Sequence, residues 1–151
     1  MATYGIEDLL YLMSRLRDPK YGCPWDRAQN FSSIVSHTIE ESYELADAIA
    51  SNNFKHIQEE LGDVLFQVVF YSQLGCEENQ FNFAEIVSTL VEKLLHRHPH
   101  VFPEGTLQSR VGEQTIETAL VKRNWEEIKA KERKSKQQLA ILDDVPLALP
   151  A

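Results

Sequence analysis

Apolar residues recur along most of this chain at the spacing of amphipathic helices, whereas the alternation typical of strands does not occur. The spacing predicts helices at about residues 6–17, 33–50, 54–76, 83–98 and 114–134. Residues with capping chemistry separate them, with Ser32 or Ser33 expected to cap the second helix, residues 51–53 the third and Asn82 the fourth. The pattern therefore predicts an all-α fold whose architecture is a four- to five-helix bundle.

The connection between the first two predicted helices contains Pro19, Gly22 and Pro24, which predicts a loop. Trp25 lies in this connection. Its indole either anchors the loop to the bundle or stacks on a base, and anchoring is the commoner role of such a residue.

The third predicted helix carries apolar residues around almost its whole circumference. Its main apolar arc comprises Phe54, Ile57, Leu61, Val64, Leu65, Val68 and Val69. Phe66 and Phe70 lie on the other side. A helix of this kind is normally buried, and one small bundle has difficulty covering it on every side. We therefore expect a homodimer or a higher homo-oligomer.

One narrow polar stripe, formed by Glu60, Asp63 and Gln67, interrupts the apolar surface of the third helix. Gly62 stands beside Asp63, although a glycine inside a helix costs about 1 kcal/mol relative to alanine. The missing side chain would let another backbone or a ligand come close. The stripe is therefore a candidate site.

The second predicted helix also combines an apolar arc with acidic residues. The arc comprises Ile34, Val35, Ile39, Tyr43, Leu45, Ala46 and Ile49. Glu41 lies at the edge of this arc and Glu44 one turn further along, whereas Glu40 and Asp47 point towards water. Glu59, on the third helix, is also expected to be a surface acid.

A short connection joins these two helices, so we expect antiparallel neighbours with Glu41 and Glu44 facing Glu60 and Asp63. Two carboxylates about 4 Å apart repel by roughly 4 kcal/mol at an effective dielectric constant of about 20. Four carboxylates in a sheltered groove therefore need protons or cations. All-oxygen ligation favours Mg²⁺, with Mn²⁺ as the alternative. The competing interpretation is a set of surface acids beside a core stripe.

The charge and the cysteines narrow the class of protein. The net charge is −8 although residues 122–136 carry seven basic and three acidic side chains, so the rest of the chain is strongly acidic. An acidic body disfavours binding to a nucleic-acid polymer. The longest apolar run, residues 64–70, is too short to span a bilayer. Cys23 and Cys76 lack the spacing of a metal motif and are too few for a disulfide framework, so we expect reduced thiols. No signal peptide is evident, and we therefore expect a cytoplasmic protein. The length of 151 residues suits one domain.

Two acidic motifs and their flanks carry a resemblance to a known family. The motifs are EESYE (40–44) and ELGD (60–63), and the flanks are LRDPKYGCPWDRAQ (16–29), RHPHVF (97–102) and NWEEIKAKER (124–133). Together they resemble the EExxE…ExxD signature of the MazG family, which comprises all-α nucleoside triphosphate pyrophosphohydrolases. The resemblance extends over about residues 6–150.

The resemblance implies Mg²⁺-dependent cleavage of a nucleoside triphosphate to a monophosphate and pyrophosphate, with a role in cleaning the nucleotide pool. The metal ligands that it implies are Glu41, Glu44, Glu60 and Asp63. It also implies that Lys93 and Arg97 contact the triphosphate and that Trp125 lies near the nucleotide. The alternatives are that both cations stay solvated near a helix C-terminus and that Trp125 attaches the fifth helix to the bundle.

In the mechanism that this family implies, metal ions neutralise the phosphates and polarise a water, and Glu40 or a free oxygen of Glu41 takes the proton. A di-iron bundle is a rival, but its Glu-x-x-His motifs do not occur here. A second rival is a non-catalytic module that keeps the fold and binds metal, nucleotide or a partner. We expect a helical domain at residues 1–134 and a C-terminal tail at 135–151. Because many family members carry tandem domains, this tail is either the end of a single-domain form or a linker to a second domain.

Overall fold

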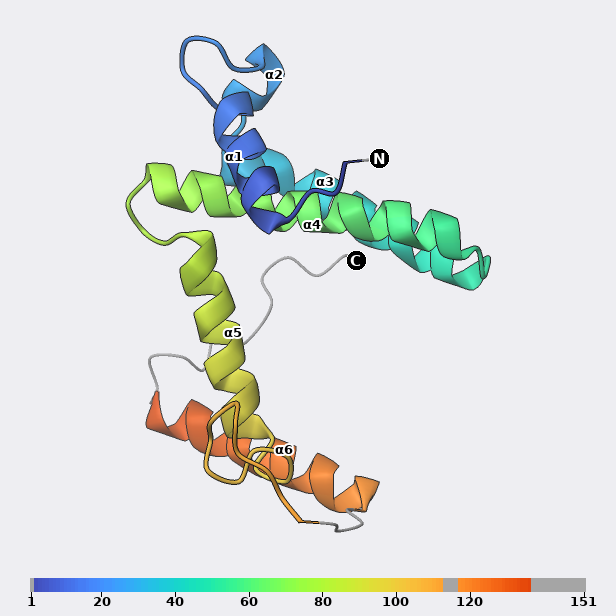
Figure 1. Ribbon diagram of the computed structural model, residues 1–151, viewed down its shortest axis with the longest axis vertical. Coiled ribbons are helices and arrows are strands. Elements are labelled where there is room, and N and C mark those ends of the chain that lie inside the picture. The colour runs from blue at the N-terminus through green and yellow to red at the C-terminus, as the bar shows by residue number, and fades with distance from the viewer. Residues whose placement is uncertain (1, 113–116, 137–151) are drawn as a thin grey trace. The chain divides into compact units, whose positions relative to one another are not determined.

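The computed structural model describes residues 2–112 and 117–136, which contain helices and no strand (Figure 1). The helices are α1 (Ile6–Leu16), α2 (Pro24–Arg27), α3 (Phe31–Ala50), α4 (Phe54–Glu77), α5 (Phe83–Arg97) and α6 (Thr118–Ser135). The all-α prediction is confirmed. The chain divides into two compact units, residues 1–87 and residues 88–151.

In the first unit, α3 and α4 form an antiparallel hairpin and lie side by side along their length (Figure 1). Asn52 turns the chain between them with a φ of 55°, a left-handed conformation that asparagine tolerates better than most residues. The side chain of Asn53 then accepts a hydrogen bond from the backbone N–H of His56 over 3.2 Å. Capping of this helix from residues 51–53 is therefore confirmed.

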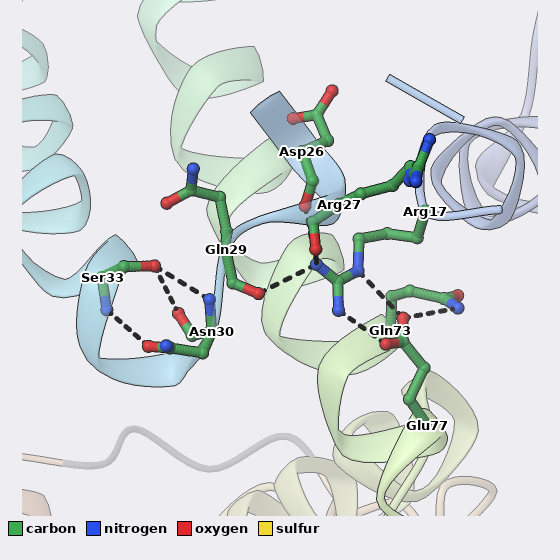
Figure 2. Close-up of polar contacts among 8 residues, drawn as sticks. All are labelled: Arg17, Asp26, Arg27, Gln29, Asn30, Ser33, Gln73 and Glu77. Atoms are coloured by element: carbon green, nitrogen blue, oxygen red, sulfur yellow. Dashed lines mark hydrogen bonds and ion pairs between the residues drawn. The ribbon is translucent and has the colours of Figure 1, made fainter. Parts of the chain in front are cut away.

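The start of α3 differs from the prediction. Its N-cap is Asn30, whose Oδ1 accepts a hydrogen bond from the Ser33 N–H over 2.9 Å. The Ser33 hydroxyl accepts in return from the Asn30 N–H over 2.8 Å, and Figure 2 shows this reciprocal pair. The predicted N-cap at Ser32 or Ser33 is wrong, because Ser33 is the third helical residue and completes the capping box that Asn30 begins.

The connection before α3 is not the plain loop that its prolines predict. Pro24 occupies the first turn of the short helix α2, a position where the missing N–H of proline costs no hydrogen bond. Arg17, at the end of α1, holds the other end of this helix (Figure 2). Its Nη1 donates to the backbone carbonyl oxygens of Asp26, Arg27 and Gln29 over 2.6, 3.2 and 2.9 Å.

The same guanidinium also binds α4. Arg17 donates from Nη2 and Nε to the two carboxylate oxygens of Glu77, over 2.6 and 3.0 Å (Figure 2). It also lies over the ring of Phe70, 5.8 Å from the ring centroid. The hydrogen bond from Arg17 lowers the pKa of the Glu77 carboxyl. The Arg17 side chain thus joins the end of α1, the C-terminal end of α2 and the C-terminal part of α4.

The core of the first unit lies where α1 and α3 meet α4. Its buried side chains are Met13, Ile34, Val69, Phe70 and Leu74. Most of the main apolar arc predicted for α4 is not buried: Val69 belongs to the core, but Phe54 is 77% exposed and Leu61 is 51% exposed. The reason is that α1 and α3 contact the side of α4 that carries Phe66 and Phe70. Within the described residues of this unit, the opposite face of α4 stays in contact with solvent.

In the second unit, residues near the end of α5 contact α6. Arg97 donates from Nη2 to Oε2 of Glu132 over 2.8 Å.

The start of α5 confirms Asn82 as its cap, because Asn82 Oδ1 accepts from the Glu85 N–H over 2.9 Å. The helix predicted from about residue 114 begins at Thr118, after an extended N-cap residue, Glu117, and residues 113–116 lie outside the described ranges. None of the described helices combines the length and apolar character that crossing a bilayer requires.

Candidate metal centre

A hydrogen-bonded polar contact sets the register between α3 and α4. The Thr38 hydroxyl donates to Oε1 of Gln67 over 3.0 Å and lies 2.7 Å from the Tyr71 hydroxyl. In an antiparallel pair, moving one turn forward from Thr38 brings the chain to Glu41, and moving one turn back from Gln67 brings it to Asp63. The register that Thr38 sets therefore places acidic side chains of the two helices opposite each other.

Carboxylate oxygens of Glu41, Glu60 and Asp63 all lie within 4.8 Å of one another, and we call these three residues the carboxylate cluster. The predicted meeting of the two acidic pairs thus holds for three of the four residues. The charge of Glu44 nevertheless acts on the cluster, because it raises the pKa of Glu41.

Burial and mutual repulsion make this cluster costly without a counter-charge. One oxygen each of Glu41 and Glu60 is buried with no hydrogen-bond partner among the described residues. Burial is the largest cause that raises the pKa of Glu41, and the charges of Glu44, Asp63 and Glu60 raise it further. A buried acceptor without a donor costs about 1–3 kcal/mol, and more when it is charged. The cluster is therefore arranged to receive protons or a cation.

The donor set fits a hard divalent cation. All donors are carboxylate oxygens, which suit Mg²⁺ or Mn²⁺ better than softer metals. The buried oxygens of Glu41 and Glu60 that lack a hydrogen-bond partner would coordinate such an ion. No atom lies within 4 Å of the position that a Cβ of Gly62 would occupy. The described part of this chain therefore makes no close contact with Gly62 on that side.

His56 supports the cluster from outside, and the sequence reasoning missed it. Its Nε2 lies 3.1 Å from Oε1 of Glu60, whose side chain is only 12% exposed. This contact orients the Glu60 carboxylate while its other oxygen stays free. The signal was available in the sequence, because residues four apart share one face of a helix.

Glu40, predicted as one of two candidate proton acceptors, is exposed and lies outside the cluster. Glu41 is half-buried and belongs to it. Gln67, the third member of the predicted polar stripe, is 8% exposed and contacts Thr38. Its role in the first unit is to set the register of the two helices.

The second unit holds the predicted substrate-binding residues. The guanidinium of Arg97 lies over the ring of Trp125, 5.4 Å from its centroid, and pairs with Glu132. Its Nε is buried without a partner among the described residues. Lys93 is exposed. Arg97 and Trp125 are thus brought together, and the ring also packs edge-on against the imidazole of His98 at 4.9 Å.

The sequence of this chain is similar to that of a known family and of several known proteins. Residues 29–102 match the MazG nucleotide pyrophosphohydrolase domain. The chain is 47% identical over 146 residues to a nucleoside triphosphate pyrophosphohydrolase of Escherichia coli K12, which covers 97% of this chain and 52% of that protein. It is 41% identical over 141 residues to a nucleoside triphosphate pyrophosphohydrolase/pyrophosphatase MazG of Thermotoga maritima, covering 93% of this chain and 50% of that protein.

The chain spans about half the length of these curated relatives. Among solved structures, it is similar to a crystal structure of a mazG-related protein from Thermotoga maritima. The TM-score is 0.64 and the identity 25%, over 82% of this chain and 98% of that one. The likeness in fold agrees with the all-α architecture expected from the helical pattern.

Proposed function

Because the chain belongs to the MazG family, we propose that it hydrolyses nucleoside triphosphates to monophosphates and pyrophosphate, using a divalent cation. The observation that carries this proposal is the carboxylate cluster with its two buried, unpartnered oxygens. The chain covers only half of its curated relatives, so their activity supports the proposal by analogy. In a cell, this reaction would remove unwanted triphosphates from the nucleotide pool.

The metal ligands in this proposal are Glu41, Glu60 and Asp63, with Glu44 as the fourth carboxylate. Mg²⁺ is the expected ion, and Mn²⁺ suits the same oxygens. When bound, the ion would neutralise phosphate charge and act as a Lewis acid towards the reacting phosphoryl group. Before the ion binds, burial and the charges of the neighbouring carboxylates raise the pKa of Glu41, which reflects the cost of keeping it charged in the cluster.

The chain's own proton acceptor is Glu41 or Glu40. Hydrolysis at phosphorus requires that the attacking water lose a proton to a nearby base. A carboxylate oxygen of Glu41 that holds no metal would serve directly, because it lies within the cluster. Glu40 is exposed, so it would serve only when bound substrate brings the water towards that side of α3.

Lys93, Arg97 and Trp125 are the proposed contacts to substrate in the second unit. Arg97 suits a polyphosphate because a guanidinium presents several donors in one plane. Its buried Nε has no partner among the described residues while Glu132 holds Nη2, so a phosphate oxygen would satisfy this donor once the side chain moves to admit it. Lys93 is exposed and would add a second positive charge.

The assembly that we propose is a homodimer or a higher homo-oligomer. The exposed apolar face of α4, which includes Phe54, Leu61 and Leu65, is the surface that a second copy would cover. Cys23 and Cys76 are both free thiols, which suits the reducing cytoplasm. The proposed partners are thus a triphosphate substrate and further copies of this chain, rather than a nucleic-acid polymer or a membrane.

A panel of ribo- and deoxyribonucleoside triphosphates with Mg²⁺ tests the activity, provided that the products are resolved. Monophosphate plus pyrophosphate supports the proposal, whereas diphosphate plus phosphate contradicts it. The matched variants are Glu41→Gln, which should abolish pyrophosphate release, and Glu59→Gln, an exposed acid outside the cluster, which should not. Metal and nucleotide binding without any turnover would instead support the non-catalytic module.

A further inference from the structure

An aromatic pocket adjoins the carboxylate cluster in the first unit. It has a volume of about 190 Å³ and is lined by Trp25, Ile34, His37, Glu41, Phe66, Gln67 and Phe70. Trp25 and His37 form one side, with their rings edge to face at 5.6 Å and 75°. Phe66 and Phe70 contribute a second pair of rings, also edge to face, at 5.9 Å. The pocket thus brings together aromatic side chains from α2, α3 and α4.

The size and the walls of this pocket suit one flat aromatic ring system. Sites for drug-sized molecules are usually about 300–1,000 Å³, so this pocket takes only part of such a molecule. Aromatic side chains bind bases of any sequence, because every base presents a π-face for stacking. Trp25 remains 52% exposed, which leaves part of the indole surface open to a stacking partner.

The pocket also offers a polar group for the edge of a ring. Gln67 is 8% exposed, and its Oε1 is occupied by the Thr38 hydroxyl. This contact fixes the amide, and none of the hydrogen bonds among the described residues uses its Nε2. An amide N–H in the wall of a pocket suits a ligand that carries an acceptor, such as a ring nitrogen or an exocyclic oxygen.

Glu41 connects the pocket to the carboxylate cluster, because its side chain belongs to both. A molecule with a flat ring at one end and a polyphosphate at the other could therefore place its ring in the aromatic pocket and its metal-bound phosphates at the carboxylate cluster. We propose that the aromatic pocket binds the base of the nucleoside triphosphate, with Trp25 as its stacking surface. This inference rests on the proposed function and adds the part of the substrate that the carboxylate cluster does not recognise.

Arg17 is the residue that positions Trp25 for this role. Three backbone carbonyls directly after Trp25, those of Asp26, Arg27 and Gln29, accept hydrogen bonds from its guanidinium (Figure 2). The Gln29 amide in turn donates to the carbonyl oxygen of Trp25 over 2.9 Å. Short helices of this length hold their shape only through such tertiary contacts. The indole is thus presented on a fixed support.

A larger pocket in the same unit suits a base less well. It measures about 460 Å³ and is lined by Arg17, Pro19, Pro24, Arg27, Ala28 and Glu77. It has no aromatic wall and shares no residue with the carboxylate cluster. The guanidinium of Arg17 is already bound by Glu77 and by backbone carbonyls, so it offers little to a ligand.

The test compares a ligand that carries a base with a ligand that has the phosphates alone. The whole chain is titrated by calorimetry, with Mg²⁺ present, against a nucleoside triphosphate whose α–β bridge carries NH in place of oxygen, and separately against inorganic tripolyphosphate. The wild-type chain should bind the nucleotide about ten- to a hundredfold more tightly, as expected for a stacked base. Equal affinities would overturn the proposal.

Variants then assign the difference to the pocket. Trp25→Ala should bring the affinity for the nucleotide close to that for tripolyphosphate and leave the tripolyphosphate affinity unchanged. Trp25→Phe should keep most of the preference, because a smaller ring still stacks. Tyr21→Ala is the matched control, since Tyr21 is 77% exposed in the same connection and lines no part of the pocket. A Trp25→Ala chain that weakens both ligands equally would contradict a base site.

Two further measurements keep this inference separate from the proposed function. Mn²⁺ uptake by the Trp25→Ala chain should match that of the wild type, which shows that the carboxylate cluster is intact. Pyrophosphate release by the wild-type chain tests the proposed hydrolysis alone. A chain that prefers the nucleotide through Trp25 but releases no pyrophosphate would support the pocket and contradict the activity.

Discussion

The Thr38 hydroxyl on α3 donates a hydrogen bond to the amide oxygen of Gln67 on α4, over 3.0 Å, at a half-buried position of the hairpin. The Tyr71 hydroxyl lies 2.7 Å from the same oxygen of Thr38. These contacts are side-chain contacts between helices, so they specify register in a way that apolar contacts do not. The register decides that Glu41 meets Glu60 and Asp63.

Thr38→Val should therefore loosen the hairpin, because valine keeps the shape and removes the hydroxyl. We expect the free energy of unfolding, measured by urea denaturation, to fall by about 1–3 kcal/mol. Mn²⁺ affinity should fall with it, since the carboxylates lose their fixed spacing. Ser42→Ala is the control, because the Ser42 hydroxyl bonds only a backbone carbonyl of its own helix on the exposed side. Unchanged Mn²⁺ affinity in the valine variant would show that Thr38 does not govern the cluster.

Glu41→Gln should separate stability from metal binding. Removing one charge relieves the repulsion in the cluster, so the metal-free variant should melt at a higher temperature than the wild type at pH 7, by about 2–4 °C for each kcal/mol gained. Adding Mg²⁺ should raise the melting temperature of the wild type and leave that of the variant unchanged. Glu59→Gln, an exposed acid on α4, should behave like the wild type in both measurements. If neither Mg²⁺ nor Mn²⁺ changed the melting temperature of the wild-type chain, that result would argue against the metal centre.

The ion pair between Arg17 and Glu77 should make stability fall in acid. The hydrogen bond from Arg17 lowers the pKa of Glu77 below its ordinary value of 4.5, so the folded state binds this proton less tightly than the unfolded state. The stabilisation is present above pH 4.5 and is lost as the pH falls through the folded-state pKa. Denaturant titrations from pH 7 down to about pH 3 should show this loss.

Glu77→Gln should flatten that acid dependence, because glutamine has no proton to gain. Glu78→Gln is the neighbouring control, since its exposed side chain forms no ion pair in the described part of the chain. Arg17→Met should cost roughly 2–4 kcal/mol at pH 7, because it leaves both Glu77 and the carbonyls at the end of α2 without their donor. An Arg17→Met chain as stable as the wild type would contradict the role of this residue as a junction.

Arg97→Gln should raise KM for nucleoside triphosphates by about tenfold or more, since a charged hydrogen bond to phosphate contributes about 1.5–3 kcal/mol. Arg123→Gln removes an exposed charge from the same unit and should leave KM within about twofold. Steady-state pyrophosphate release measures both. Equal KM values for the two variants would mean that Arg97 only holds Glu132 and Trp125 in place.

Much of the helical structure could be predicted from the sequence, because the spacing of apolar residues is a property of each helix by itself. The approximate ranges of α1, α3, α4 and α5 followed from periodicity, and residues 51–53 and Asn82 were recognisable as caps. The acidic pairs on α3 and α4 were equally visible, since residues three apart in a helix lie on one face.

Which face of a helix is buried depended on its neighbours. The pattern favoured the arc of α4 with Leu61 and Leu65, although Phe66 and Phe70 on the other side are apolar too, and it did not show which side the neighbouring helices would contact. The choice was made by α1 and α3, which contact only one side. The N-cap of α3 was missed for a local reason, because Asn30 and Ser33 act as a pair three residues apart.

The sequence by itself determined the helices and the acidic residues that they carry, because local hydrogen bonding and side-chain spacing need no distant partner. Only the tertiary structure decided that Glu41 meets Glu60 and Asp63, that Trp25 and Phe66 share a pocket, and that Arg17 binds Glu77. Each of these contacts joins residues far apart along the chain. Their proximity depends on how whole helices dock, and that is set by the sum of many interactions between helices rather than by any local pattern.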